Sequence, residues 1–265
     1  MNHRLGIIGF GQMGGAIGSV LVANGALEAG QVTAWDLSPD ARGHAREAGI
    51  ATAGSVAELC AGCDIVLLSV KPQDAPTVLE QAGAGLADKA VVSIVAGWDV
   101  ETLSAHLPES ARVLRVMPNT PARVAAGAFG LSEATTVTDA EKATIQDWFS
   151  TIGLVEWVPE KLMDAVTGLS GGIPAYAAII VDALADGGVQ QGLKRPVARR
   201  LVLQSLLGSA QLMLETDLGP GDLKDAVCSP AGTTIEGVRA IERAGVRSGL
   251  IEAVIAASQR AAELK

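Results

Sequence analysis

The fold is decided by the stretch Arg4-Leu5-Gly6-Ile7-Ile8-Gly9-Phe10-Gly11-Gln12-Met13-Gly14. Its first half is an apolar run typical of a buried strand, and residues 16–23 continue with the pattern of a helix. Between them, Gly9, Gly11 and Gly14 form a GxGxxG. In this position the first glycine allows a tight turn, the second lets backbone amides approach a pyrophosphate, and the third permits close packing of helix on strand. The stretch therefore predicts a dinucleotide-binding fold.

A second strand, 31–35, ends in Asp36, which lies 22 residues past Gly14, where a ribose-binding acid belongs. A carboxylate there favours the free 2′-hydroxyl of NAD(H). Ser38 and Arg42 follow closely and suit the 2′-phosphate of NADP(H). The sequence predicts NADP(H) or NAD(H) and leaves the choice open.

Strands and helical segments alternate through the first 158 residues, which indicates a parallel, doubly wound, Rossmann-like sheet. The expected strands lie near 4–9, 31–36, 64–70, 90–96, 112–117, 126–131 and 153–158. Three turns, at 70–72, 95–97 and 117–119, fall at the carboxyl ends of strands, where ligands bind in open α/β sheets. Each could also be ordinary turn chemistry, but together they predict a cleft beside the glycine loop.

After Pro159 the strand pattern stops and the chain reads as helices. These are expected near 161–170, 174–191, 195–214, 220–227, 231–244 and 247–263. We therefore expect an α/β fold with a dinucleotide-binding domain, 1–158, followed by an all-helical substrate-binding and dimerisation domain, 159–265. The helix from Pro174 carries small apolar residues around Ala178 and Ala185, a surface that predicts a helical partner.

The segment 224–236 contains a readable helix start, Ser229-Pro230-Ala231-Gly232-Thr233-Thr234. Ser229 is expected to be the N-cap and Pro230 the first helical residue. The unpaired amides of the first turn and the helix dipole would then bind a carboxylate, with Gly232 leaving the approach open. An ordinary helix can begin in the same way, so the pattern alone leaves both interpretations standing.

Composition excludes several classes of function. The chain has 265 residues, 49% of them hydrophobic and 3% aromatic, which fits a soluble protein with a core of Ala, Val, Leu and Ile. Its net charge of −9 argues against a nucleic-acid or anionic-membrane partner. Residues 1–3 lead directly into the first strand, and we expect no apolar run of the ~18 residues that span a membrane. A cytoplasmic location follows as the expectation.

The three cysteines, Cys60, Cys63 and Cys228, are too few for a disulfide framework. Cys60 and Cys63 have the CxxC spacing of redox and zinc sites, but further metal ligands are missing nearby. We expect buried packing thiols and no metal site.

Several segments together resemble the pyrroline-5-carboxylate reductases. They are the glycine loop, Val70-Lys71-Pro72, Met117-Pro118-Asn119-Thr120-Pro121-Ala122, Asp164-Ala165-Val166-Thr167-Gly168-Leu169-Ser170-Gly171, Pro174-Ala175-Tyr176, 182–189 and 224–236. The resemblance spans nearly the whole chain and implies reduction of 1-pyrroline-5-carboxylate to L-proline with NAD(P)H, by an interlocked homodimer that could form a ring of dimers. One departure is Gly172-Ile173, where the family usually has Ser-Gly.

The resemblance also implies roles for single residues. Thr234 matches the position that hydrogen-bonds the ring nitrogen, and Ser229 a position near the substrate carboxylate. Other residues expected at the substrate are Thr233, Gly232, Val227, Glu160, Ala96 and Gly97, although Glu160 could be merely an exposed first-turn acid. The expected cofactor residues are Gly9, Phe10, Gly11, Gln12, Met13, Gly14, Asp36, Ser38, Ser55, Ser69, Val70, Lys71, Pro72 and Asn119.

An imidazole acid is not expected, because the histidines, His3, His44 and His106, lie in the first domain away from the strand-end turns. A protonated iminium needs mainly orientation, which threonines can supply. Tyr176 is expected to be structural. One alternative is a related enzyme, either an imine reductase or a β-hydroxyacid-type enzyme. The β-hydroxyacid-type enzyme would need a catalytic lysine, and only Lys161 stands in the corresponding region. The other alternative is a non-catalytic nicotinamide sensor.

Overall fold

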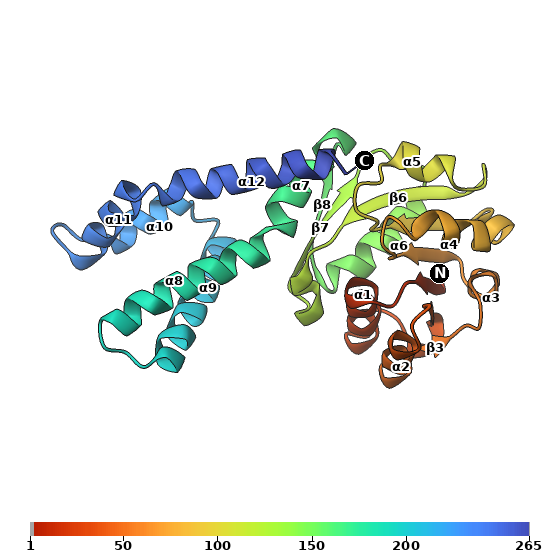
Figure 1. Ribbon diagram of the computed structural model, residues 1–265, viewed down its shortest axis with the longest axis horizontal. Coiled ribbons are helices and arrows are strands. Elements are labelled where there is room, and N and C mark those ends of the chain that lie inside the picture. The colour runs from red at the N-terminus through yellow and green to blue at the C-terminus, as the bar shows by residue number, and fades with distance from the viewer. Residues whose placement is uncertain (1–2, 265) are drawn as a thin grey trace. The chain divides into compact units, whose positions relative to one another are not determined.

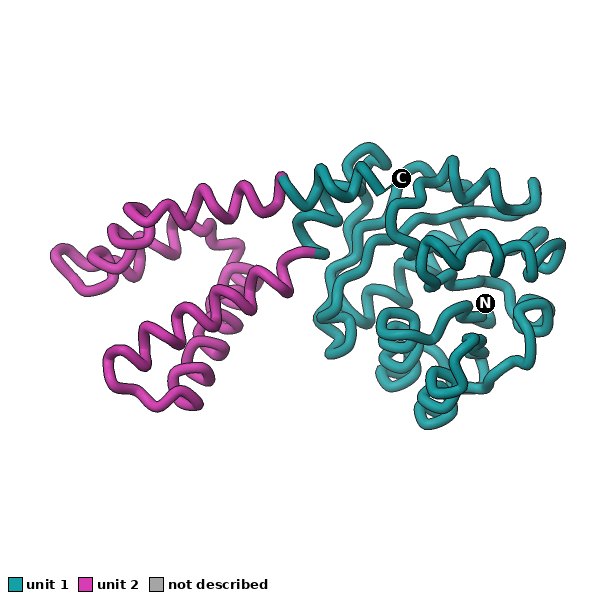
Figure 2. The backbone as a smooth tube through the Cα atoms, in the orientation of Figure 1, with its two compact units in different colours: residues 1–171, 256–265 teal, residues 172–255 magenta. Residues whose placement is uncertain are grey.

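The computed structural model describes residues 3–264 and divides into two compact units, coloured separately in Figure 2. The first comprises residues 1–171 and 256–265, and the second residues 172–255. The sheet ends at Val158, close to the expected domain boundary. The first unit extends beyond that residue because the short helical turns of 160–171 belong to it.

The first unit contains an eight-stranded sheet of order β3-β2-β1-β4-β5-β6-β7-β8. Its strands are β1 (Leu5–Ile8), β2 (Val32–Trp35), β3 (Ala51–Thr52), β4 (Ile65–Leu68), β5 (Ala90–Ser93), β6 (Arg112–Met117), β7 (Gly127–Ser132) and β8 (Gly153–Val158). The neighbours from β3 to β6 pair in parallel, with Ile8 opposite both Trp35 and Leu68. The strand order reverses between β1 and β4, so the expected doubly wound, Rossmann-like α/β class is confirmed.

The last two strands correct the expectation of a wholly parallel sheet, because β6 and β7 are antiparallel. A parallel return needs a crossover of about a dozen residues or more. The connection over residues 118–126 holds only the short turn Thr120–Val124 and is too short for one. Helix α6 (Asp139–Ser150) does provide a crossover, and β8 accordingly pairs in parallel with β7.

Helices cover both faces of the sheet (Figure 1). One apolar cluster joins one face to α1 (Gln12–Ala23), α2 (Pro39–Glu47) and α6. The other joins the opposite face to α3 (Val56–Ala61), α4 (Ala75–Ala82) and α5 (Val100–Ala105). Strands buried on both sides explain the continuous apolar runs in the sequence.

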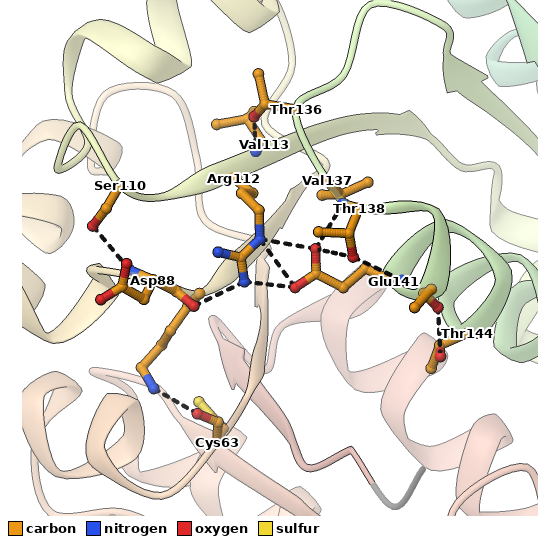
Figure 3. A network of polar contacts seen from close by, with 12 residues as sticks. Cys63, Asp88, Ser110, Arg112, Val113, Thr136, Val137, Thr138, Glu141 and Thr144 are labelled. Atoms are coloured by element: carbon orange, nitrogen blue, oxygen red, sulfur yellow. Dashed lines mark hydrogen bonds and ion pairs between the residues drawn. The ribbon is translucent and has the colours of Figure 1, made fainter.

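An ion-pair network joins the start of α6 to Arg112, the first residue of β6 (Figure 3). The carboxylate of Glu141 accepts hydrogen bonds from both Nε and Nη2 of Arg112, with the shortest distances 2.9 Å from Nε and 2.6 Å from Nη2. It also accepts the backbone N–H of Thr138, whose hydroxyl caps Glu141 in return. Burial by itself raises the pKa of Glu141, but the hydrogen bonds from Arg112 and Thr138 outweigh burial and lower it.

The remaining helices fall close to the expected positions. After the turn Glu160–Leu162 they are α7 (Met163–Val166), a π-helical turn (Thr167–Gly171), α8 (Ile173–Gln190), α9 (Arg195–Thr216), α10 (Pro220–Val227), α11 (Thr233–Arg243) and α12 (Val246–Ala262). Ile173, the departure noted above, begins α8 and is 47% exposed.

The second unit has almost no core of its own within the described residues. Helix α8 buries Ala185 alone and α9 buries Ala198 alone, while α10 and α11 bury none. Large apolar side chains instead remain open, among them Ile179 at 70% and Leu214 at 80% exposure. Uncovered apolar surface of this extent marks a site of protein or membrane interaction.

One described helical stretch, Glu160–Gln190, is long and apolar enough to cross a membrane by length and composition. The expectation that no segment meets this criterion was therefore wrong. The helix of a soluble protein can pass the same test, so the finding alone is weak evidence of a membrane span.

The Arg112–Glu141 pair makes a testable contribution to stability. Glu141→Gln should lower the free energy of unfolding at neutral pH by about 2 kcal/mol, because charged hydrogen bonds of a largely buried carboxylate are lost. Since the folded-state pKa is depressed, the difference should be full above the unfolded pKa, about 4.3, and vanish as pH falls through the folded value. Urea unfolding of both proteins at several pH values measures it. A difference that persists unchanged at the lowest pH would contradict this assignment.

Candidate functional site

Close backbone approach at the end of β1 builds the glycine loop. Gly9 has a φ of +93°, and a Cβ there would lie 2.4 Å from the carbonyl oxygen of Ser69. A Cβ on Gly14 would lie 2.1 Å from the carbonyl oxygen of Gly9. These two positions therefore accept only glycine, and α1 packs tightly against the strand ends.

Gly11 differs from its neighbours, because a Cβ there would meet nothing within 4 Å. It is the N-cap of α1 and has no side chain that could cap the first amides of the helix. The first turn of α1 thus offers its amides and its positive dipole end to open space. A pyrophosphate fits this cradle, and a side chain at Gly11 would occupy the approach.

Asp36 ties the end of β2 to the glycine loop. Its Oδ2 accepts the backbone N–H of Phe10 at 2.7 Å, and its Oδ1 accepts that of Ser38 at 2.8 Å. The guanidinium of Arg42 donates to the carbonyl oxygens of Asp36 and Leu37, at 2.5 and 3.1 Å. Each carboxylate oxygen keeps lone pairs for a further donor, such as a ribose hydroxyl. Arg42 is directed at the backbone.

A cleft of about 550 Å³ runs along the carboxyl ends of β1, β2, β4, β5 and β6. Ten of the fourteen predicted cofactor residues line it: Gly9, Gly11, Gln12, Met13, Asp36, Ser38, Ser69, Val70, Lys71 and Pro72. Ala96, predicted at the substrate, lines the same cleft. The cleft also includes Met117 and Pro118, from the strand-end turn predicted at 117–119, and Trp35 and Ile94, which the sequence marked only as strand residues.

The other four predicted cofactor residues do not line this cleft. Phe10 is 3% exposed and borders a second hollow between α1 and α2 that also reaches His44 and Arg123. Gly14 serves packing. Ser55 caps α3 by accepting the N–H of Glu58. The amide of Asn119 donates to the carbonyl of Ser170 at 3.1 Å, and its oxygen accepts the N–H of Ala128 at 2.8 Å. Asn119 therefore braces the turn.

Gly97 and Glu160, both predicted at the substrate, do not line this cleft. Gly97 has a φ of +79°, and a Cβ there would lie 2.5 Å from the carbonyl oxygen of Leu264. Glu160 is no free surface acid, because its Oε1 bonds the guanidinium of Arg115 at 2.8 Å and the backbone N–H of Val100 at 3.4 Å. Arg115 lies in the middle of β6 and belongs to no motif, so the sequence alone does not mark it as a site residue.

The predicted substrate residues of the second unit gather at one turn, with a corrected geometry. The N–H of Gly232 bonds the carbonyl of Ser229 at 3.0 Å, and Ala231 has a φ of +55°. The segment is therefore a tight turn, and the N-cap is Gly232, not Ser229. The expected N-cap was wrong because Ser-Pro can begin a turn as readily as a helix.

Helix α11 consequently begins at Thr233, and the unpaired amides belong to Thr233, Thr234 and Ile235. The side chains of Thr233 and Thr234 are exposed, as is that of Val227 at 55%. A Cβ at Gly232 would lie 2.2 Å from Oγ of Ser229 and 3.0 Å from its carbonyl oxygen, so it would displace the Ser229 hydroxyl. The turn presents hydroxyls and amides to the outside of its unit.

The remaining candidates have structural roles. The hydroxyl of Tyr176 donates to the carbonyl of Ala253 at 3.3 Å, which fits the expected packing role. Cys60 and Cys63 are buried. Burial, assisted by the neighbouring Cys60, raises the pKa of Cys63 to about 12, so its thiol stays protonated and unreactive.

Comparison with known families places both parts of the chain. The family described as pyrroline-5-carboxylate reductase dimerisation matches residues 160–264. The family described as NADP oxidoreductase, coenzyme F420-dependent, matches residues 4–97. Pyrroline-5-carboxylate reductases of Methanosarcina acetivorans and Synechocystis are each 40% identical, covering 99% and 100% of this chain and 98% and 99% of theirs.

Solved structures agree with the sequence relatives. A pyrroline-5-carboxylate reductase from Coxiella burnetii has a TM-score of 0.93 at 32% identity and covers 100% of this chain and 99% of its own. A Plasmodium falciparum pyrroline carboxylate reductase with NADP bound has a TM-score of 0.89 at 30% identity, covering 99% and 98%. An imine reductase from Myxococcus stipitatus, at 17% identity and a TM-score of 0.53, shares the fold alone.

A glycine loop that admits a pyrophosphate and a cleft along the ends of parallel strands define a dinucleotide-binding domain, and the NADP oxidoreductase match over residues 4–97 makes the protein a nicotinamide-dependent oxidoreductase. The whole length of the chain matches one kind of such enzyme. The chain belongs to the pyrroline-5-carboxylate reductase family.

Two glycine variants separate binding from folding. Gly11→Ala should leave the melting temperature nearly unchanged, because its Cβ meets no protein atom, but weaken NAD(P)H binding by about 10-fold or more. Gly14→Ala is the matched control and should destabilise the protein, because its Cβ would overlap the loop. Titration calorimetry and thermal unfolding measure the two effects. Unchanged NAD(P)H affinity in Gly11→Ala would show that the pyrophosphate does not bind next to Gly11.

Proposed function

We propose that this protein reduces 1-pyrroline-5-carboxylate to L-proline with NAD(P)H, the last step of proline synthesis. The observation that carries the proposal is the full-length likeness to enzymes of that name, 38–40% identical in Methanosarcina, Synechocystis and Escherichia coli. The intact turn Ser229–Gly232 and the cleft with its glycine loop support it.

The cofactor would be held by the first unit. The amides at the start of α1 would bind its pyrophosphate, and Asp36 would bind its adenosine ribose. Ala96, Met117 and Pro118 border the far end of the cleft, which would receive the nicotinamide. When bound, the reduced nicotinamide supplies the hydride for the imine carbon.

The substrate would be held by the turn and helix start of the second unit. The amides of Thr233, Thr234 and Ile235, at the positive end of α11, suit the substrate carboxylate. The hydroxyl of Thr234 would orient the ring nitrogen, and Ser229 lies at the same turn. A substrate that arrives protonated on nitrogen needs no protein acid, which accords with His44 and His106 being exposed and absent from the cleft lining.

Two other functions are weighed against this one. A related reductase of another cyclic imine would share the fold, but such a likeness here is 17% identical and carries no more than the fold. A non-catalytic nicotinamide sensor would keep the glycine loop and would have no need of a substrate turn. The retained Ser229, Gly232, Thr233 and Thr234 favour the enzyme.

The uncovered faces of α8 and α9 support a homodimer formed through residues 159–265, which could associate into a ring of dimers. We place the protein in the cytoplasm, with no nucleic-acid or membrane partner, because its net charge is −9 and the long apolar helix is suited to a second copy of the chain.

Substitution of Thr234 tests the substrate turn. Thr234→Ala should lower kcat/KM for pyrroline-5-carboxylate about 10-fold or more, a loss of roughly 1.4 kcal/mol, while leaving NAD(P)H affinity unchanged. Thr234→Ser, which keeps a hydroxyl, should be milder. Thr144→Ala is the control, because that hydroxyl bonds a carbonyl of its own helix in α6. Wild-type efficiency in Thr234→Ala would remove the hydroxyl from the mechanism.

Assembly is tested at Ala178, which is exposed on α8 and borders a groove with Asp182, Arg199 and Leu203. Wild type should sediment as a dimer or larger, and Ala178→Trp should weaken association and activity together. Ala143→Trp, on the exposed side of α6, should change neither. A stable, active wild-type monomer of 27.0 kDa would overturn the proposed dimer.

Cofactor preference is tested at Asp36. Its carboxylate beside a 2′-phosphate would be repulsive, so NADH should be used at least as well as NADPH. Asp36→Ser should shift the ratio of kcat/KM values towards NADPH. Because the carboxylate also holds Phe10 and Ser38, Asp36→Asn serves as the control that keeps one acceptor without the charge. A strong NADPH preference that Asp36→Ser leaves unchanged would contradict the assignment.

A further inference from the structure

A buried guanidinium lies on β6, two residues before Met117, which lines the cleft. The side chain of Arg115, on β6, is 5% exposed and pairs with two carboxylates, Glu160 at 2.8 Å and Asp164 at 3.5 Å. Burying an arginine costs free energy unless its charge is paired, and removal of a partner leaves the buried charge uncompensated. The cluster is therefore a tight junction between β6 and the helical turns of residues 160–166.

The junction is connected to both sides of the cleft end. Side chains alternate along a strand, so Arg115 lies on the same face of β6 as Met117, which lines the cleft. Glu160, held by Arg115, accepts the N–H of Val100 at the start of α5. That residue closes the turn after β5 in which Ala96 lines the cleft.

Only one oxygen of Glu160 takes part. Oε1 accepts from Arg115 and from Val100, whereas Oε2 is buried and has no hydrogen-bond partner within the described chain. A single oxygen of Glu160 thus accepts both hydrogen bonds. A glutamine preserves this acceptor, because its carbonyl oxygen can occupy the Oε1 position, but its amide at the Oε2 position is left without a partner, which costs stability.

We propose that Arg115 is a positioning residue for hydride transfer, acting through Glu160. It fixes the Ala96 turn relative to Met117, and these two segments border the end of the cleft that receives the nicotinamide and the imine. The proposal rests on the proposed reductase function. Misplacement of reacting groups by a fraction of an ångström to 1 Å slows reactions by up to about 100-fold, whereas binding of the remote adenosine half would be untouched.

The test compares Glu160→Ala, Glu160→Gln and Arg115→Lys in single-turnover reduction of pyrroline-5-carboxylate, with NADH affinity measured separately by calorimetry. Glu160→Ala should slow hydride transfer about 10-fold or more while NADH affinity stays within about 2-fold. Glu160→Gln should stay within about 3-fold of wild type, because it keeps the acceptor. Arg115→Lys keeps the charge but loses the planar set of guanidinium donors, so its rate of hydride transfer should lie between those of the two Glu160 variants.

Glu141→Ala is the matched control for Glu160→Ala, since it removes an Arg–Glu pair made with another arginine of β6, away from the cleft, and should change stability but not the transfer rate. A wild-type rate in Glu160→Ala overturns the proposal. So does a Glu160→Gln rate as low as that of Glu160→Ala, because the carboxylate charge would then act directly. If Glu160→Ala does not fold, an Arg115→Lys rate equal to wild type overturns it. A wild type that reduces no pyrroline-5-carboxylate would instead defeat the proposed function, which separates the two failures.

Discussion

The close approach of backbone segments at the end of β1 is the constraint on which the first unit depends. Gly9 and Gly14 leave no room for a Cβ, so α1, β1 and β4 meet at contact distance. Asp36 then holds the resulting loop to β2 through the N–H of Phe10. Because these contacts fix the amides of α1 at the switch in strand order, one open cleft follows along the strand ends.

Sequence patterns predicted those parts of the fold that local chemistry decides. The glycine loop, the strand ends and α10 at 220–227 lie where expected. The reversal of β7 was missed because it depends on the length of a connection, and the Ser229 N-cap was wrong because two local structures compete for Ser-Pro. Ser170, which accepts from Asn119, lies 51 residues away in the chain, and Glu160, which accepts from Arg115, lies 45 residues away, so no local pattern reveals these contacts.

The second unit obeys a different constraint. Helices α8 and α9 are well formed but bury Ala185 and Ala198 alone within the described chain, so their stability cannot come from their own core. This dependence links assembly to function, since the turn that carries Ser229 and Thr234 is built on the same unit. A dimer would thus cover the apolar helices of the unit that carries the proposed substrate turn.

The central claim is that the cofactor cleft and the Ser229–Thr234 turn together serve one reaction. The most direct measurement mixes purified protein with NADH or NADPH and 1-pyrroline-5-carboxylate, and quantifies both the cofactor oxidised and the L-proline formed. The account predicts equimolar amounts, and little turnover of 1-pyrroline, which lacks the carboxylate for the α11 amides. Oxidation without proline, or equal turnover of both imines, would contradict it.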